Sequence, residues 1–308
     1  MKKVNGLSEK FLMANCEYIE FDISIENKFN EFFENEVLIS KIENEIILNY
    51  ANRNIKEILI PSNVTRIGSS SFASCNKLKS ISFMNKSNIK SIGNEAFVYS
   101  SLEKLEIPES LEIIEDNWLF VVKKLKTIEL SPLNKYFSLI DNKFLIRKIE
   151  NNKFLNGFDL LFAPRNIEYV LIPSYIVRIN NCAFSFCTKL KSISFEKVNE
   201  NQEFSSLKEI GSHSFSDCSS IKSIVSIPCS LRIINSFCFF KSNNLESLEF
   251  LSEELTFDYG SFLSCRSISL LSFENAKKII FGFNSFFDTK ANIIVHVKNN
   301  AEIIMQSY

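Results

Sequence analysis

The stretch from Ile60 to Phe83, IPSNVTRIGSSSFASCNKLKSISF, decides the fold of this chain. Counted from Ile67 as phase zero, apolar residues stand at +5, +11, +14 and +16, with a cysteine at +8. The same apolar spacing returns, in places with small shifts, from the anchors Ile92, Ile114, Ile179, Ile210, Ile234, Phe257 and Phe281. Most of these eight repeats begin 22 to 25 residues after the one before. A period of this length is typical of a solenoid, in which each coil packs only against its neighbours.

The +5 phase is the most uniform position, because seven of the eight repeats have phenylalanine there and only Leu119 departs. The small residue expected at +4 is replaced in that same repeat by Trp118, which indicates an exchange of bulk between adjacent positions. One phenylalanine per coil, stacked on the next, predicts an aromatic spine along the solenoid. This accounts for part of the 30 phenylalanines in 308 residues.

Glycine is concentrated just after the anchor, where four of the seven glycines stand: Gly68, Gly93, Gly211 and Gly282. Asparagine is found at the same phase in two other repeats, and Glu115 is the exception. Because glycine and asparagine tolerate a left-handed backbone, we expect a tight turn with positive φ at this phase.

Phases +14 to +16 alternate apolar and polar residues, which predicts a short strand with one face inward. Strands of successive repeats should pair in parallel about 4.8 Å apart and form a curved sheet. Several strands end in Ile-Pro, as at Ile60-Pro61, and proline stops a strand because it has no N–H to donate.

In addition to the short repeat, the chain contains a longer duplication. Residues 34–44, ENEVLISKIEN, match residues 141–151, DNKFLIRKIEN, and the Glu43-Asn44 and Glu150-Asn151 pairs are expected to form hairpin turns. The sequence therefore predicts two tandem modules, about 28–132 and 133–300. Residues 1–27 are expected to form an irregular N-terminal cap, and 301–308 a C-terminal cap with a helical turn.

The combination of Ile60–Gly68, Ser71–Cys75 and Leu78–Ile81 resembles the BspA-like leucine-rich repeats. The resemblance covers roughly residues 28 to 300. It implies an α/β-class leucine-rich-repeat solenoid, β-rich with few short helices, and a parallel sheet on the concave face. Members of that family include bacterial surface proteins and surface-antigen-like proteins of parasitic protists. The resemblance implies adhesion or protein recognition and brings no shared catalytic residues.

The net charge and the N-terminal sequence indicate which class of partner to expect and where in the cell the protein is located. The formal net charge of −1 argues against a nucleic-acid or membrane-surface binder. Residues 1–18 contain no apolar run of signal-peptide length, and no stretch approaches 18 apolar residues. The sequence therefore predicts a cytoplasmic protein without membrane insertion. The alternative is a cell-surface protein exported by an unconventional route.

The cysteines and histidines do not form a pattern that indicates an enzyme or a cofactor site. Four cysteines, Cys75, Cys187, Cys218 and Cys265, share the +8 phase with Ser100, Val122, Ser242 and Thr289 in other repeats. A position that accepts all these residues indicates a small buried group, so free thiols are expected, with a Cys187–Cys218 disulfide as the alternative. The absence of Cys-x-x-Cys argues against a zinc site. Neither His213 nor His296 has triad partners at a suitable spacing, so no catalytic residue is predicted.

The outward positions +13 and +15 of the predicted sheet are the candidate partner-binding surface. They carry small hydroxyls and a few charges, at Ser80, Ser82, Lys104, Glu106, Thr127, Glu129, Ser192, Ser194, Ser247 and Glu249. The alternative is a sheet face that is merely solvated. We therefore expect a non-enzymatic protein-interaction module that presents a concave surface to a protein partner. The second hypothesis is a cell-surface adhesion antigen that binds host or matrix components, and the sequence leaves the oligomeric state open.

Overall fold

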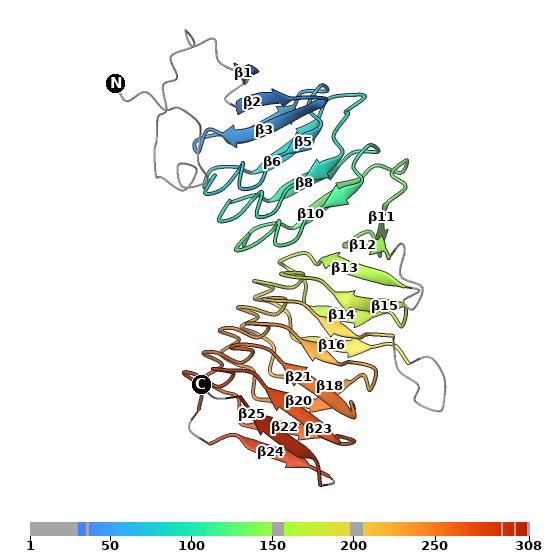
Figure 1. Cartoon of the computed structure of the whole chain (residues 1–308), viewed down its shortest axis with the longest axis vertical. Coiled ribbons are helices and arrows are strands. Elements are labelled where there is room, and N and C mark those ends of the chain that lie inside the picture. The colour runs from blue at the N-terminus through green and yellow to red at the C-terminus, as the bar shows by residue number, and fades with distance from the viewer. Residues whose placement is uncertain are drawn as a thin grey trace. The chain divides into compact units, whose positions relative to one another are not determined.

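The computed structural model describes residues 30–34, 37–149, 157–197, 206–290, 292–298 and 300–306 (Figure 1). The chain divides into two compact units, unit 1 (Met1–Phe137) and unit 2 (Ser138–Tyr308). The predicted N-terminal cap, residues 1–27, lies outside the described residues.

Unit 1 contains two sheets that share the same coils. The six-stranded sheet has the order β1 (Asn30–Glu34), β2 (Val37–Ile42), β3 (Glu45–Ala51), β5 (Arg66–Ile67), β7 (Ser91–Ile92) and β9 (Ile113–Ile114). The four-stranded sheet is formed by β4 (Glu57–Ile60), β6 (Ser80–Phe83), β8 (Lys104–Ile107) and β10 (Thr127–Leu130).

Unit 2 repeats this plan on a larger scale. Its nine-stranded sheet has the order β11 (Phe137–Ile140), β12 (Phe144–Lys148), β13 (Phe158–Phe162), β15 (Ile176–Ile179), β17 (Glu209–Ile210), β19 (Ile233–Ile234), β21 (Glu254–Phe257), β23 (Lys278–Phe281) and β25 (Glu302–Met305). A two-stranded sheet contains β14 (Tyr169–Ile172) and β16 (Ser192–Phe195). A four-stranded sheet contains β18 (Ser223–Ile227), β20 (Ser247–Phe250), β22 (Leu270–Phe273) and β24 (Ile294–Val297).

Equivalent phases of successive coils lie side by side, as the repeat predicted. Anchor pairs with anchor, Ile67 with Ile92, and phase +14 pairs with its equivalent, Ile81 with Leu105, both in parallel. The predicted strand at +14 to +16 is therefore confirmed. The anchor itself lies at the end of a second strand of two or four residues, so each coil contributes to two sheets where one was predicted.

The predicted aromatic spine is confirmed. In unit 2 the rings of Phe184, Phe215, Phe239, Phe262 and Phe286 follow one another at 5.2, 5.6, 5.4 and 5.4 Å between centroids, with planes within 12°. In unit 1, Phe97 packs 5.6 Å from Phe72 and edge-on against Trp118 at 6.3 Å. Trp118 thus takes over the aromatic contact that Leu119 cannot make.

The expected positive φ after the anchor is wrong. Gly93 and Gly211 do not have positive φ there, but a Cβ on either would lie 2.7 Å from the backbone nitrogen of Ser69 and 2.6 Å from that of Asn181. Glycine is needed because the backbone of the preceding coil passes so close.

Positive φ instead occurs at +3 and +7 of every repeat. The +3 residues are Ser70, Glu95, Asn117, Cys182, His213, Phe237, Gly260 and Asn284, and the +7 residues are Ser74, Tyr99, Val121, Phe186, Asp217, Lys241, Ser264 and Asp288. In most coils the N–H groups of +3, +5 and +7 donate to carbonyls of the next coil, as Phe237, Phe239 and Lys241 donate to Tyr259, Ser261 and Leu263. The turns are thereby joined by their own hydrogen-bond ladder.

No helix is present in the part of the chain that the structure describes, so the few short helices implied by the resemblance are not found there. Residues with φ near +55° at +3 and +7 of each repeat interrupt any helix between the two strands, because a helix needs φ near −63°. The helical turn predicted at 301–308 is also wrong. Residues Glu302–Met305 form β25, because Ile303 and Met305 continue the register of Ile279 and Phe281 on β23.

The first described strands of each unit pair antiparallel and are followed by an arginine, which is part-buried at Arg53 and buried at Arg165. The turn predicted at Glu43-Asn44 joins β2 to β3 and is confirmed, whereas residues 150–156 lie outside the description, although β12 and β13 do pair antiparallel. Arg165 is stacked 5.2 Å over Phe162 and donates to the carbonyls of Ala183 at 2.8 Å and Cys182 at 3.1 Å. Arg53 lies over Tyr50 and donates to Ser71 in the same way. Each guanidinium thereby adds a second donor to a carbonyl of the first coil, beside the backbone N–H of Ala51 at Ser71 and of Ala163 at Ala183.

Candidate functional site

The ten predicted partner-binding residues fall into separate groups. Six lie on three adjacent strands of unit 1: Ser80, Ser82, Lys104, Glu106, Thr127 and Glu129. They face outward, because the residues between them, Ile81, Leu105 and Ile128, are buried. In unit 2, Ser192 and Ser194 lie on β16, whereas Ser247 and Glu249 lie on β20 in a different sheet. The structure brings together the six of unit 1 and not the ten.

The six residues of unit 1 form an ordered polar face. The register places Lys104 between Ser80 and Thr127, and Glu106 beside Glu129. The two carboxylates have different partners, because Glu129 is 2.8 Å from the Lys104 ammonium and Glu106 accepts the backbone N–H of Phe83 at 3.1 Å. The Glu129 carboxylate raises the pKa of Lys104, so the ammonium stays charged.

A shallow hollow of about 320 Å³ adjoins this face at the carboxyl ends of β6, β8 and β10. It is lined by residues 83–87, 106–109 and 129–131, so Glu106 and Glu129 belong to both the face and the hollow. The residues after each strand, such as Met84 and Pro108, were missed as site residues. For Pro108 the signal that could have found it is the Ile107-Pro108 pair at the strand end, which we interpreted only as a strand stop, whereas Met84 has no such signal.

The corresponding face of unit 2 is more apolar than predicted. Tyr169 and Leu171 on β14 are 62% and 57% exposed, and Val225, Leu270 and Ile294 are exposed at outward positions of later strands. The ammonium of Lys191 lies 5.5 Å over the Tyr169 ring and 2.7 Å from the Glu168 carboxylate. These side chains occupy phases +13 and +15, so the repeat could have identified them.

The +8 cysteines are buried free thiols with a structural role. The Cys218 and Cys265 thiols donate to the carbonyls of Phe184 at 3.1 Å and Phe239 at 2.8 Å in an earlier coil. Ser242 donates to Phe215 in the same way at 2.7 Å, which explains why serine replaces cysteine at this phase. The prediction of free thiols at this phase is confirmed, and Cys187 and Cys218 do not form a disulfide in the structure.

Burial keeps these thiols protonated. It raises the pKa of Cys187 to about 11 and the pKa of Cys265 to about 12, and it likewise raises the pKa of Cys238, a buried cysteine at +4, to about 12. A nucleophilic or metal-binding cysteine needs a lowered pKa, so the thiols of this core suit packing and hydrogen bonding.

The two histidines also lack catalytic geometry. Burial lowers the pKa of His213 to about 4, and its ring stacks on Phe237 at 5.0 Å. At His296 the Ser272 hydroxyl lies 3.4 Å from both the imidazole Nδ1 and the Glu274 carboxylate. The hydroxyl stands between base and acid, whereas a triad places the imidazole between them. Among the described residues no group of three His, Cys, Asp or Glu side chains could hold a metal ion, and no helix is long and apolar enough to span a membrane.

Parallel strands that recur once per coil, with a stacked phenylalanine at +5, define a β-solenoid of the leucine-rich-repeat class. The chain belongs to the BspA type leucine rich repeat family, whose model matches six copies over residues 40–158 and 195–308. No curated protein is a significant match.

Three solved structures share the fold. The pneumococcal vaccine antigen PcpA is 20% identical, with a TM-score of 0.63 over 83% of this chain and 69% of its own. A leucine-rich repeat protein from Eubacterium ventriosum is 18% identical, with a TM-score of 0.61 over 86% and 83%. A leucine rich cell surface protein from Faecalibacterium prausnitzii is 16% identical, with a TM-score of 0.55 over 90% and 97%. At these identities the likeness concerns the fold.

Proposed function

We propose that this chain is a non-enzymatic interaction module that binds a protein partner through the outward face of β6, β8 and β10. The observation that carries the proposal is the polar face itself, with Lys104, Thr127 and Glu129 open to solvent beside a hollow that extends the face. Solenoids use such extended sheet surfaces to hold other molecules. The near-neutral net charge supports a protein rather than a nucleic acid as the partner.

The face supplies recognition chemistry but little apolar area. Charges and hydroxyls at the surface of an interface give specificity and steer association, and apolar anchors give most of the affinity. The apolar residues that line the hollow are Phe83, Met84, Ile107, Pro108 and Leu130, of which Met84 is 38% exposed. We therefore expect a partner that places one apolar side chain in the hollow and complementary charges over Lys104 and Glu129.

Affinity capture with the whole chain, followed by mass spectrometry, tests this proposal. A double variant, Thr127→Arg with Glu129→Arg, puts positive charge beside Lys104 without touching a buried residue. We expect it to lose the captured protein while its melting temperature is unchanged. Lys77→Glu, an exposed charge in a turn of the same unit, is the matched control and should retain the partner. Equal capture by the double variant and the wild type would exclude this face.

A cell-surface adhesion antigen is the second candidate. It is favoured by two proteins of the same fold, the vaccine antigen PcpA and the cell surface protein from Faecalibacterium prausnitzii. Protease treatment of intact cells distinguishes the two candidates. Digestion of the chain on intact cells supports the surface antigen, and protection until lysis supports a cytoplasmic module.

A further inference from the structure

One edge of unit 1, which we call the basic edge, is strongly positive. It is formed by phases +9 to +12, which follow the turns and come directly before β4, β6, β8 and β10. The only acidic residue at these phases is Glu103. Six exposed lysines share the same phases within four successive coils: Lys56, Lys77, Lys79, Lys123, Lys124 and Lys126.

Backbone hydrogen bonds place the coils of the basic edge side by side. The N–H of Lys79 donates to the carbonyl of Lys56 at 2.7 Å. The N–H of Glu103 donates to Lys79 at 2.8 Å, and that of Lys126 donates to Glu103 at 2.9 Å. The +12 residues therefore form one column, in which neighbouring coils are about 4.8 Å apart. The lysines at +9 and +10 stand beside this column, two or three residues earlier in the chain.

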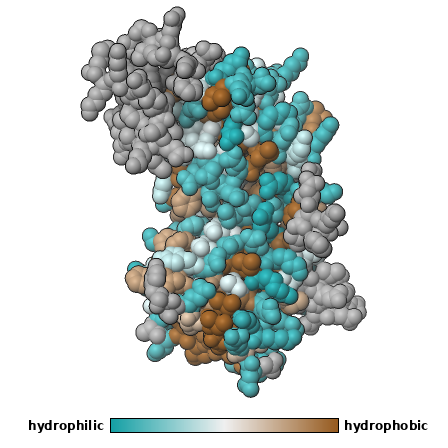
Figure 2. All heavy atoms as spheres, in the orientation of Figure 1, coloured by the Kyte–Doolittle hydropathy of each residue, from teal (hydrophilic) through white to brown (hydrophobic). Residues whose placement is uncertain are grey.

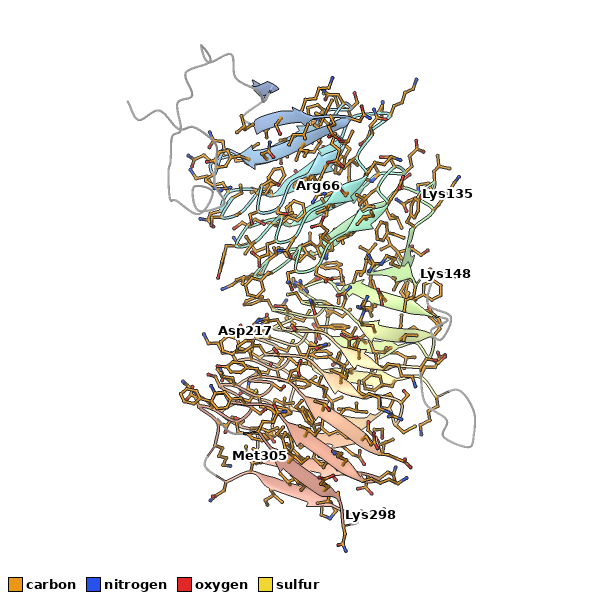
Figure 3. All side chains as sticks on the ribbon, viewed as in Figure 1. Arg66, Lys135, Lys148, Asp217, Lys298 and Met305 are labelled. Carbon is orange, nitrogen blue, oxygen red and sulfur yellow. The ribbon has the colours of Figure 1, made fainter. Side chains whose placement is uncertain are left out.

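Most lysines of the basic edge have no carboxylate partner. On the other sheet of unit 1, Arg66, labelled in Figure 3, is 2.7 Å from the Glu115 carboxylate. On the basic edge the Glu103 carboxylate is 3.7 Å from the ammonium of Lys126. Four lysines form no ion pair with any described residue: Lys56, Lys77, Lys79 and Lys124. Because like charges this close repel one another, an anion that binds here relieves the repulsion.

The repeat does not itself require lysine at these phases. In unit 2 the +12 column contains Glu168, Lys191, Lys222 and Glu246, so that its charges balance. The ammonium of Lys191 is 2.7 Å from the carboxylate of Glu168 in the neighbouring coil. The excess of positive charge is therefore a property of unit 1 and not of the coil.

The basic edge offers charge without apolar anchors. Its exposed residues other than lysine are Asn54 and Asn76. The apolar residues of these phases are all buried: Ile55, Leu78, Leu102 and Leu125. Figure 2 likewise shows mostly hydrophilic side chains on the visible face of unit 1. A folded protein partner takes most of its affinity from apolar anchors, whereas a linear polyanion takes it from the counterions that lysines displace.

We infer that the basic edge binds a linear sulfated polysaccharide. Phases +9 to +12 contain no aromatic side chain on which the bases of a single-stranded nucleic acid would stack. All six exposed cations are lysines, whereas the phosphates of nucleic acids are more often held by the planar fork of arginine. Lysine is a hydrated point charge, which suits a flexible chain of sulfate groups. This ligand goes beyond the protein partner proposed above, because the basic edge lies before the strands and the protein-binding face lies on them.

The test is the binding of fluorescently labelled heparin to the full chain, measured by anisotropy between about 50 and 200 mM salt. We expect the affinity to fall about 100-fold over this range, since each displaced counterion steepens the dependence on salt. The triple variant Lys77→Gln, Lys79→Gln and Lys124→Gln removes three ammonium groups that form no ion pair. It should bind more weakly at low salt, and its affinity should fall by less than about 10-fold over the same range.

The matched control makes the same change of net charge at the same phases of unit 2. It is the triple variant Lys189→Gln, Lys191→Gln and Lys222→Gln, whose affinity and salt dependence should equal those of the wild type. All six substituted side chains are exposed, so both variants should keep the melting temperature of the wild type. The variant Thr127→Arg with Glu129→Arg, designed to lose the protein partner, should still bind heparin, so the two proposals can fail separately.

Three results would overturn the inference. The first is no binding of heparin by the wild type at about 50 mM salt. The second is an equal loss of affinity in the two triple variants, which would assign the binding to net charge. The third is tighter binding of oligodeoxythymidylate or polyglutamate of matched charge, which would assign the basic edge to a nucleic acid or an acidic protein.

Discussion

The substitution Phe215→Ala removes the second of the five stacked rings of the spine in unit 2. Phe215 is 1% exposed and lies between Phe184 and Phe239, at 5.2 and 5.6 Å, with both pairs of rings nearly parallel. Its backbone N–H donates to Cys238 and its carbonyl accepts from Ser242, and neither contact needs the ring. The substitution therefore tests the spine and leaves the ladder of the turns in place.

The expected cost follows from the loss of a fully buried ring. Phe→Ala in a packed core costs about 3–5 kcal/mol, which includes the cavity that remains. Two stacked pairs are lost together, and each aromatic pair adds about 0.5–1.5 kcal/mol beyond its buried area, so the upper half of that range applies. For a unit of this size each kcal/mol lowers the melting temperature by about 2–4 °C. We expect the transition of unit 2 to fall by roughly 8–20 °C.

Differential scanning calorimetry of the full chain is the measurement. Phe97→Ala, in the spine of unit 1, identifies which transition belongs to which unit. Phe287→Ala is the matched control, because that ring is 63% exposed and its loss should change stability by no more than about 0.5 kcal/mol. A melting temperature for Phe215→Ala equal to that of Phe287→Ala would refute the stacked-coil account.

Three further predictions concern unit 2. Gly211→Ala should destabilise unit 2 by about 1–3 kcal/mol, because the new Cβ would lie 2.6 Å from the backbone nitrogen of Asn181. A variant that is as stable as the wild type in urea would contradict the close approach of the two backbones. Cys265→Ser should leave the free energy of unfolding nearly unchanged, whereas Cys265→Val should lower it by about 1–3 kcal/mol because the Phe239 carbonyl loses its donor. Equal urea midpoints for the two variants would show that the hydrogen bond is unimportant. Burial lowers the pKa of His213 to about 4, so the unfolded chain binds the proton first and stability should decline as the pH falls from about 6.5 to about 4. His213→Phe should flatten that decline, and melting curves across this pH range would show whether it does.

The repeat made the coil predictable because it places equivalent residues on equivalent strands. A phenylalanine every coil at +5, a small donor at +8 and alternation at +14 to +16 each correspond to one contact between neighbouring coils. The turn at Glu43-Asn44 was predictable for the same reason, since two polar residues separate two apolar runs.

Features that depend on distances between coils could not be predicted in the same way. A strand of two residues, such as Arg66–Ile67, is too short to show alternation. Glycine at +1 suggested a left-handed turn, whereas the structure uses glycine there to let two backbones pass. The left-handed positions contain Glu95, Val121 and Phe237, and none of these residue types signals such a conformation.

The sequence predicted which side of the sheet the candidate residues occupy, but it did not predict which of them lie together. Outward phases follow from alternation, so Ser80, Lys104 and Glu129 lie where expected. Their grouping depends on which strands share a sheet, and no local pattern shows that β16 and β20 belong to different sheets. Tyr169 and Leu171 were overlooked because apolar residues were assigned to the core. Partner binding by this face stays a prediction.

The left-handed turns have a consequence for how the repeats can diverge. At +3 and +7 serine, glutamate, asparagine, tyrosine, histidine and phenylalanine all occur, and most of these side chains are at least partly in water. Glycine would adopt this backbone with less strain, yet only Gly260 is found. The edge formed by these turns can therefore change its chemistry one coil at a time while the spine beneath it stays constant. A designer who wished to graft a new recognition sequence onto this scaffold would begin at those sixteen positions.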